Sequence, residues 1–174
     1  DSYYILFCKI EFTEKKMDTK IEKIALFGKT LTELKEIVES LNFPGFTAKQ
    51  IALWLYKKNI NSIDEMTNLS LSAREILNKN YFIGTIKPID KKTSQDGTLK
   101  YLFATDNGKF IETAYIPEEN RNTLCVSSQV GCKMACVFCM TGKQGFQNHL
   151  SAGEIVNQLK SIDESEQVSN IVFM

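Results

Sequence analysis

The sequence has 174 residues, of which 43% are hydrophobic and 24% charged, and its 21 basic residues balance its 21 acidic ones. This apolar fraction excludes a disordered chain, and the charge balance excludes a strongly basic nucleic-acid-binding arm. No run of about 18 apolar residues occurs, which excludes a membrane-spanning helix. Lys9 and Glu11 interrupt the apolar beginning and no cleavage motif follows, so we expect no secretory signal.

The two ends of the sequence indicate a fragment of a longer chain. Residue 1 is Asp, and Met17 is a more natural start, so we interpret residues 1–22 as an extension outside the folded domains. At the other end, residues 168–174 have the composition of a buried strand after which the sequence stops.

Residues 23–80 are predicted to form a small helical domain. Thr30 and Glu33 have the spacing of a capping box and precede apolar residues at helical intervals. Thr47 begins a second predicted helix, and residues 70–78 form a third. The short connections between them are typical of a compact module.

From residue 81 onward the apolar residues alternate as in strands. We predict strands at residues 81–89, 98–105, 109–116, 123–128 and 168–174. Asp96-Gly97 and Asp106-Asn107-Gly108 are typical hairpin turns. A second capping box, Ser151 with Glu154, predicts a helix before the last strand.

This order of elements predicts the α/β class, because a helix between two strands is the beginning of a parallel sheet or barrel. We therefore divide the chain into the extension, the helical domain, an antiparallel β-hairpin or linker segment at 81–122, and the beginning of a barrel at 123–174.

Three of the five cysteines lie within eight positions, as Cys132-x3-Cys136-x2-Cys139. An odd number of cysteines without a secretory signal favours the reducing cytoplasm over a disulfide framework. Three thiolates can bind three irons of a [4Fe-4S] cluster and leave the fourth iron without a protein ligand. Structural zinc usually has four ligands, so a Cys3His site completed by His149 is the alternative.

The cysteine pattern, with Phe138 before the last cysteine, resembles that of the radical S-adenosylmethionine (SAM) superfamily. The resemblance implies that Cys132, Cys136 and Cys139 bind a [4Fe-4S] cluster and that Phe138 belongs to the cofactor site. In that superfamily the open iron binds SAM, and an electron from the cluster releases a 5′-deoxyadenosyl radical. The resemblance also implies a partial TIM barrel, truncated here, and an electron donor such as flavodoxin.

The flanking segments narrow the resemblance further. Residues 112–117, 123–132 and 139–146 are similar to the RlmN family of dual-specificity adenine-C2 RNA methyltransferases, as are residues 24–30 and 46–51. This similarity implies a monomeric cytoplasmic enzyme that acts on 23S rRNA and tRNA. It also implies that the helical domain, of helix-hairpin-helix type, helps to bind RNA.

The family transfers its methyl group through a cysteine near the carboxyl terminus, and a covalent enzyme–RNA adduct is formed. Carried over to this sequence, the resemblance implies that Glu112 is the base that removes the C2 proton and that Cys125 is the thiol that resolves the adduct. The methyl-carrying cysteine would lie beyond Met174, so we expect this chain alone to be catalytically incomplete.

Other interpretations stay open at the level of sequence. An adenine-C8 methyltransferase of 23S rRNA would have the same cluster motif, and a non-catalytic RNA-binding module would hold zinc or nothing at the cysteines. Candidate phosphate contacts in the helical domain are Lys49, Lys57, Lys58 and Arg74. A solvated helix face explains the same charges equally well.

Overall fold

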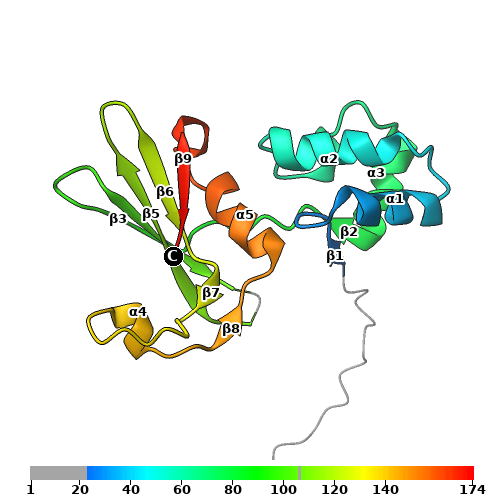
Figure 1. Ribbon diagram of the computed structural model, residues 1–174. Coiled ribbons are helices and arrows are strands. Elements are labelled where there is room, and N and C mark those ends of the chain that lie inside the picture. Colours follow the sequence, from blue (N-terminus) through cyan, green and yellow to red (C-terminus); the bar gives the residue numbers. More distant parts are fainter. Residues whose placement is uncertain (1–22, 106) are drawn as a thin grey trace, which may run out of the picture.

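The computed structural model describes residues 23–105 and 107–174, so the extension, with its Cys8, and Asp106 lie outside the described residues. The described chain forms a helical module and a sheet module, which lie side by side (Figure 1). Among the described helices, none has both the length and the apolar composition needed to cross a bilayer.

The helical module contains the three helices that the sequence predicts. Its elements are β1 (Ile24–Ala25), α1 (Leu31–Ser40), α2 (Thr47–Lys57), the 3-10 helix η1 (Ile63–Glu65), α3 (Leu71–Asn80) and β2 (Tyr81–Phe82). The predicted capping box begins α1: Thr30 Oγ1 accepts a hydrogen bond from Glu33 N, and Glu33 Oε2 accepts one from Thr30 N at 2.7 Å. The buried core of the module includes Leu26, Leu34, Val38, Ile51, Leu55, Ile63, Met66 and Leu77.

The strand predicted at residues 81–89 is wrong beyond Phe82. β2 pairs in parallel with β1 inside the helical module and does not join the large sheet. Gly84 then adopts a left-handed conformation with φ of 91° and lies against Ala25, which ends the strand. The apolar alternation in this segment therefore serves the core of the helical module, where Ile83 is buried.

The sheet module has five strands in the order β3-β4-β5-β6-β9. Their bounds are β3 (Asp90–Thr93), β4 (Leu99–Ala104), β5 (Phe110–Pro117), β6 (Asn122–Val126) and β9 (Asn170–Phe173). Neighbouring strands are antiparallel except β6 and β9, which are parallel and are connected through α5 (Ala152–Lys160). This parallel pair and the mixed architecture confirm the predicted α/β class.

Helix α5 covers one face of the sheet. Its Ile155 and Leu159 pack against a core in which the residues at alternate strand positions are buried, namely Tyr101, Phe103, Ile111, Tyr115, Leu124 and Val126. The opposite face carries the intervening residues, including Glu112 and Cys125, and α5 does not cover it. The remaining elements are β7 (Gln129–Val130), α4 (Met140–Lys143), β8 (Asn148–His149) and η2 (Ser165–Gln167).

A polar contact fastens the segment after α5 to the far edge of the sheet. Tyr101 on β4 donates a hydrogen bond to Glu164, and Lys91 Nζ on β3 lies 3.0 Å from Glu164 Oε1. Burial raises the pKa of Tyr101 to about 12, so its hydroxyl keeps the proton that it donates. Hydrogen bonds with Tyr101 and Glu164 raise the pKa of Lys91, so the ion pair persists at alkaline pH.

The two modules touch through the first turns of α5. A Cβ on Gly153 would lie 2.9 Å from the Cα of Gly28, so the two backbones are in direct contact. One turn further, the Asn157 side chain donates to Ile86 O at 2.7 Å and accepts from Ile86 N at 2.9 Å. The same helix that covers the sheet therefore also holds the helical module.

Replacing Gly153 by alanine tests this contact. Alanine favours a helix over glycine by about 1 kcal/mol, so an isolated α5 would gain stability. In this structure the added methyl group overlaps Gly28, and we expect the free energy of unfolding of the chain to fall by about 1–3 kcal/mol in urea denaturation. Gly45→Ala is the control, because a Cβ at Gly45 meets no atom within 4 Å. A Gly153→Ala chain as stable as the wild type would contradict the contact.

Candidate functional site

The three clustered cysteines lie on a loop that leaves the sheet after β6. The loop is closed at its base, because β7 pairs with β8 in antiparallel register, Gln129 opposite His149 and Val130 opposite Asn148. Gly131 has φ of 69°, and a Cβ there would overlap the carbonyl oxygen of Gly145. The two ends of the loop therefore meet where only glycine fits.

Backbone hydrogen bonds hold Cys136 and Cys139 in one turn. Cys139 N donates to Cys136 O at 3.1 Å, and Lys143 N donates to Cys139 O at the same distance as α4 begins. Gly142 packs against this turn, since a Cβ on it would lie 2.9 Å from Cys136 N. Ala135 has a left-handed φ of 46°, which turns the chain immediately before Cys136.

The Cys139 thiol is prepared for ionisation. The backbone N–H groups of Gly142, and then of Thr141, lower the pKa of Cys139 below that of an ordinary thiol. The thiolate is the form of cysteine that binds metals. The turn that presents this sulfur therefore also favours the charge state that a metal needs.

A cavity of about 440 Å3 brings several of the sequence-predicted site residues together. Cys132 and Cys139 from the loop and Glu112 from β5 all line it. The other lining residues are Leu102, Phe110, Ile111, Ser127, Gln129, Gly131, Thr141, Gln144 and Met174. The cavity thus joins the cysteine loop to the sheet beside the carboxyl end of β6, the edge at which parallel α/β sheets bind ligands.

Cys125, Cys136 and Phe138 do not line this cavity. Cys125 lies on β6 opposite Ala114, which is two residues along β5 from Glu112. Cys125 and Glu112 are therefore diagonal neighbours on the same face of the sheet, at a typical spacing of about 7–8 Å.

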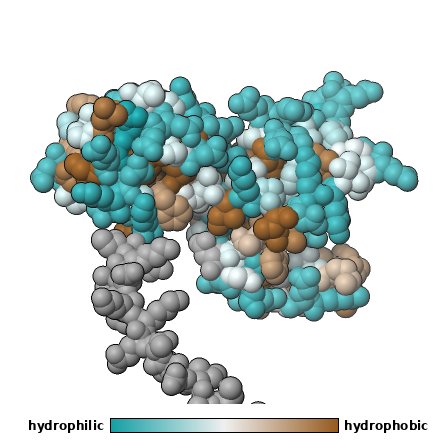
Figure 2. Space-filling model, turned by 180° about the vertical axis from the view of Figure 1, so that it is seen from behind, coloured by the Kyte–Doolittle hydropathy of each residue, from teal (hydrophilic) through white to brown (hydrophobic). Residues whose placement is uncertain are grey.

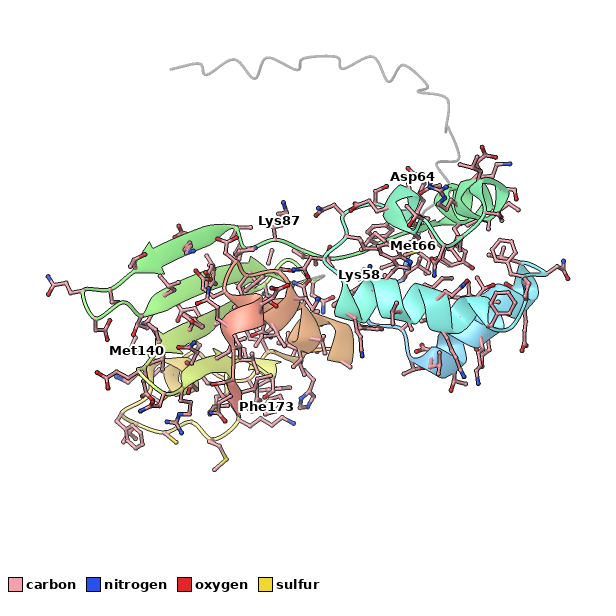
Figure 3. All side chains as sticks on the ribbon, turned by 90° about the horizontal axis from the view of Figure 1, so that it is seen from above. Lys58, Asp64, Met66, Lys87, Met140 and Phe173 are labelled. Carbon is pink, nitrogen blue, oxygen red and sulfur yellow. The ribbon has the colours of Figure 1, made fainter. Side chains whose placement is uncertain are left out.

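The cysteine loop exposes large apolar side chains. The exposed fractions are 77% for Met134, 83% for Val137, 87% for Phe138 and 70% for Met140. Met140 lies at the end of the sheet module away from the helical module (Figure 3). Seen from behind, most of the surface is hydrophilic, with hydrophobic side chains in separate patches (Figure 2). Four large exposed apolar side chains on one short loop favour a binding role for the loop.

The three cysteines of the loop are the residue type that binds iron–sulfur clusters, but their sulfur atoms do not point toward one common position. Within residues 23–105 and 107–174, no three His, Cys, Asp or Glu side chains are placed so that they could share a metal ion. The four described cysteines are free thiols, and all are partly exposed. His149 packs against Phe146 in a tilted arrangement, with ring centroids 4.8 Å apart and the ring planes at 57°. Among the described residues it is not grouped with the cysteines as a Cys3His zinc site would require.

One residue that lines the cavity, Gln129, has a hydrogen-bond acceptor without a partner in the described part of the chain. Gln129 Oε1 is buried and, among the described residues, has no hydrogen-bond partner. A bound molecule with N–H or O–H groups would satisfy this oxygen. The wall of the cavity therefore fits a polar cofactor, in agreement with the three thiols of the loop.

Sequence reasoning missed four of the polar residues that line the cavity: Ser127, Gln129, Thr141 and Gln144. All four lie inside the segments that resemble the RlmN family. Serine, threonine and glutamine are common surface residues, so their types alone carry no signal of a site.

Comparisons with known proteins agree with this description. Residues 24–83 match the family model of the ribosomal RNA large subunit methyltransferase N-terminal domain. The chain is 58% identical over 152 residues to a probable dual-specificity RNA methyltransferase RlmN of Phocaeicola vulgatus, covering 87% of the chain and 44% of that relative. It is 40% identical over 171 residues to the corresponding protein of Bacillus velezensis, covering 95% and 47%.

The fold is similar to a crystal structure of a radical SAM methyltransferase from Sphaerobacter thermophilus. The TM-score is 0.74 at 34% sequence identity, with 86% of this chain and 47% of the other covered. The chain thus spans slightly less than half the length of the relatives that it matches.

The lowered pKa of Cys139 gives a test of the loop geometry. In the folded chain, Cys139 should react with iodoacetamide from a lower pH than it does in denaturant, because the N–H groups that stabilise its thiolate are lost on unfolding. By linkage, this group stabilises the fold above its unfolded pKa, and the contribution disappears as the pH falls through the folded pKa. Peptide mass spectrometry of the alkylated chain gives the rate at Cys139, and equal pH midpoints in both states would contradict the geometry.

Proposed function

The chain belongs to the RlmN family, and from this membership we propose that it is part of a radical SAM enzyme that methylates C2 of adenosine in 23S rRNA and tRNA. The observation that carries the proposal is the cavity shared by Glu112, Cys132 and Cys139. A carboxylate and two thiols that line one cavity support the proposal, because a radical methylation at this carbon atom would need a base and cluster ligands close together.

The cysteine loop would hold the cofactors of this reaction. Cys132, Cys136 and Cys139 are the proposed cluster ligands, and the exposed Phe138 beside them is the proposed contact to SAM. When bound, a [4Fe-4S] cluster would supply the electron that cleaves SAM into a carbon radical. The closed base of the loop, at Gly131 and Gly145, would keep this chemistry at the edge of the cavity.

Glu112 and Cys125 are the proposed groups for completing the reaction. Glu112 lines the cavity, where its carboxylate can accept the proton that leaves adenine C2. Cys125 lies on the same face of the sheet, where its thiolate can attack the sulfur that joins enzyme and RNA. A disulfide would form as the bond from that sulfur to the bridging carbon breaks, and the carbon would keep the electron pair and take up a proton as the new methyl group. A base and a thiol as diagonal neighbours suit two consecutive steps on one adduct.

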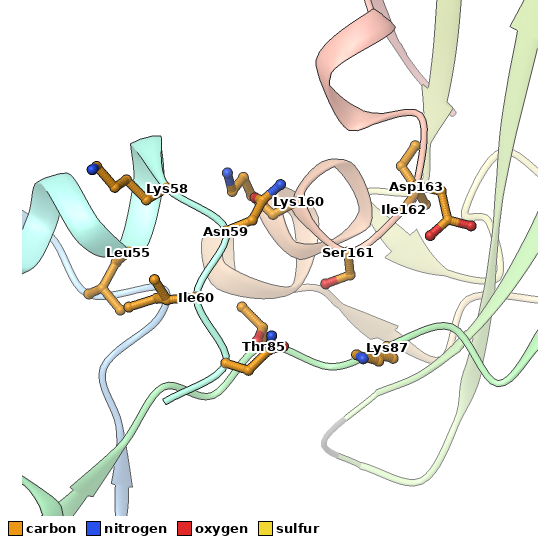
Figure 4. Close-up of a pocket in the computed structure, with 11 residues that line it drawn as sticks. Leu55, Lys58, Asn59, Ile60, Thr85, Lys87, Lys160, Ser161, Ile162 and Asp163 are labelled. Carbon is orange, nitrogen blue, oxygen red and sulfur yellow. The ribbon is translucent and has the colours of Figure 1, made fainter. Parts of the chain in front are cut away.

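The helical module and its junction with the sheet are the proposed contacts to the RNA backbone. Lys49, Lys57 and Lys58 are exposed on or immediately after α2, with Lys58 Nζ 4.5 Å from the centre of the Trp54 ring. Arg74 instead donates a hydrogen bond to Asp64 O at 2.6 Å, so part of its charge is used inside the module. A second cavity, of about 340 Å3, lies between the modules and is lined by Lys58, Lys87 and Lys160 (Figure 4).

Anaerobic reconstitution of this chain with iron and sulfide tests the cluster. We expect about four irons and four sulfides per chain and a visible absorption that bleaches with dithionite. Cys136→Ala should lose the cluster, because two thiolates remain, whereas Cys125→Ala should retain it. Tight binding of zinc without sulfide would contradict the cluster and favour the non-catalytic alternative.

A chimera tests the reaction, with residues 1–174 joined to the complementary carboxyl-terminal part of the Phocaeicola vulgatus relative. With SAM, reductant and RNA, we expect a methyl group on adenosine C2, located by mass spectrometry of nucleosides. Cys125→Ala should accumulate a covalent protein–RNA adduct, visible as a shifted band in denaturing gels, with Ser94→Ala, an exposed serine between β3 and β4, as the control. Methylation at C8, or normal turnover by the Cys125→Ala chimera, would contradict the proposal.

A further inference from the structure

Gln158 is a fully buried polar residue in the interface between α5 and the sheet. Its exposed fraction is 0%, and its apolar neighbours on the helix pack into the core of the sheet module. A buried side-chain amide is costly unless its donors and acceptor find partners. In this structure the amide is well satisfied, and its partners lead to the candidate site.

The Gln158 amide bridges two strands. Its Oε1 accepts hydrogen bonds from Thr113 Oγ1 at 2.7 Å and from Ser127 N at 2.8 Å. Its Nε2 donates to Ser127 O at 2.8 Å. The side chain thus binds both backbone groups of Ser127, as a neighbouring strand would, at the point where the chain leaves β6 for the cysteine loop.

Ser127 continues the connection to Glu112. Its hydroxyl donates a hydrogen bond to the carbonyl oxygen of Glu112 at 2.7 Å. Both residues line the 440 Å3 cavity, and Thr113, the other partner of Gln158, is the next residue on β5. A continuous chain of hydrogen bonds therefore connects α5, the beginning of the cysteine loop and the backbone that carries the Glu112 carboxylate.

We propose that Gln158 and Ser127 are positioning residues that fix Glu112 relative to the cysteine loop. Neither touches the reacting atoms: Gln158 acts through Ser127, and Ser127 acts through the Glu112 backbone. The inference rests on the proposed role of Glu112 as the base. Proton transfer requires a base within hydrogen-bond reach of the proton, so a loosened Glu112 backbone slows this step.

The geometry predicts a specific defect. A variant that only loses stability forms less adduct and less product in the same proportion. A variant that misplaces Glu112 still forms the adduct and then fails to lose the C2 proton, so the adduct accumulates. The Michaelis constant for RNA stays unchanged, because no RNA contact has been removed.

The experiment compares Gln158→Met, Ser127→Ala and Glu112→Gln in the chimera. Methionine keeps the size of Gln158 and removes its side-chain hydrogen bonds. Ser127→Ala removes only the hydrogen bond from the Ser127 hydroxyl to the carbonyl oxygen of Glu112. We expect both variants to release product about 10- to 100-fold more slowly and to accumulate the adduct, the same defect that we expect of Glu112→Gln. Gln167→Met is the matched control: this glutamine accepts a hydrogen bond from Tyr115 at 3.3 Å and, in the described part of the chain, has no hydrogen bond with Glu112 or Ser127.

A double variant separates positioning from general stability. If Ser127 acts through Glu112, then adding Ser127→Ala to Glu112→Gln slows the reaction no further. Additive effects of the two substitutions would overturn the inference. A Ser127→Ala chimera that turns over at the wild-type rate without accumulating adduct would also overturn it, and this variant remains informative if Gln158→Met does not fold. Normal turnover by Glu112→Gln would instead overturn the proposed base, and the inference with it.

Discussion

The parallel pairing of β6 with β9 through α5 is the constraint on which the site depends. The connection places α5 on one face of the sheet, where its apolar residues bury one set of alternating strand side chains. The opposite face, with Glu112 and Cys125, stays clear of the helix. The chain must leave β6 at its carboxyl end to reach α5, and the cysteine loop is inserted there. Thiols, carboxylate and cavity therefore meet at one edge of the sheet because of its topology.

Close backbone contacts and buried hydrogen bonds hold the cysteine loop in place at this edge of the sheet. Apolar packing alone would allow the loop several arrangements. Gly131 and Gly145 bring the two ends of the loop into contact, and any side chain at Gly131 would separate them. Gln158 fixes Ser127 at the point where the loop begins. Directional contacts of this kind limit the arrangements open to a loop whose apolar side chains are largely exposed.

Local signals in the sequence were sufficient for the positions of the helices, whereas the role of the three clustered cysteines stays a prediction. The capping boxes at Thr30 and Ser151 predicted where α1 and α5 begin, because both partners of a capping box lie within four residues. The strand prediction for the segment after Tyr81 was wrong because its alternating apolar residues pack into a core formed with residues distant in sequence. Ser127 and Gln158 were not identifiable for the same reason, since their contacts join positions 31 residues apart. The roles of Glu112 and Cys125 remain predictions from resemblance, now supported by their placement on one face.

Helix α5 connects the parts of this chain that the proposed reaction would use. Gly153 contacts the helical module, Asn157 binds the connecting segment at Ile86, and Gln158 holds the beginning of the cysteine loop. Ile155 and Leu159 pack on the sheet. These contacts occupy different faces of one nine-residue helix. A single short element therefore lies between the module that carries the lysines proposed to bind RNA and the strand that carries the carboxylate proposed to accept the C2 proton, although its sequence signals only an amphipathic helix.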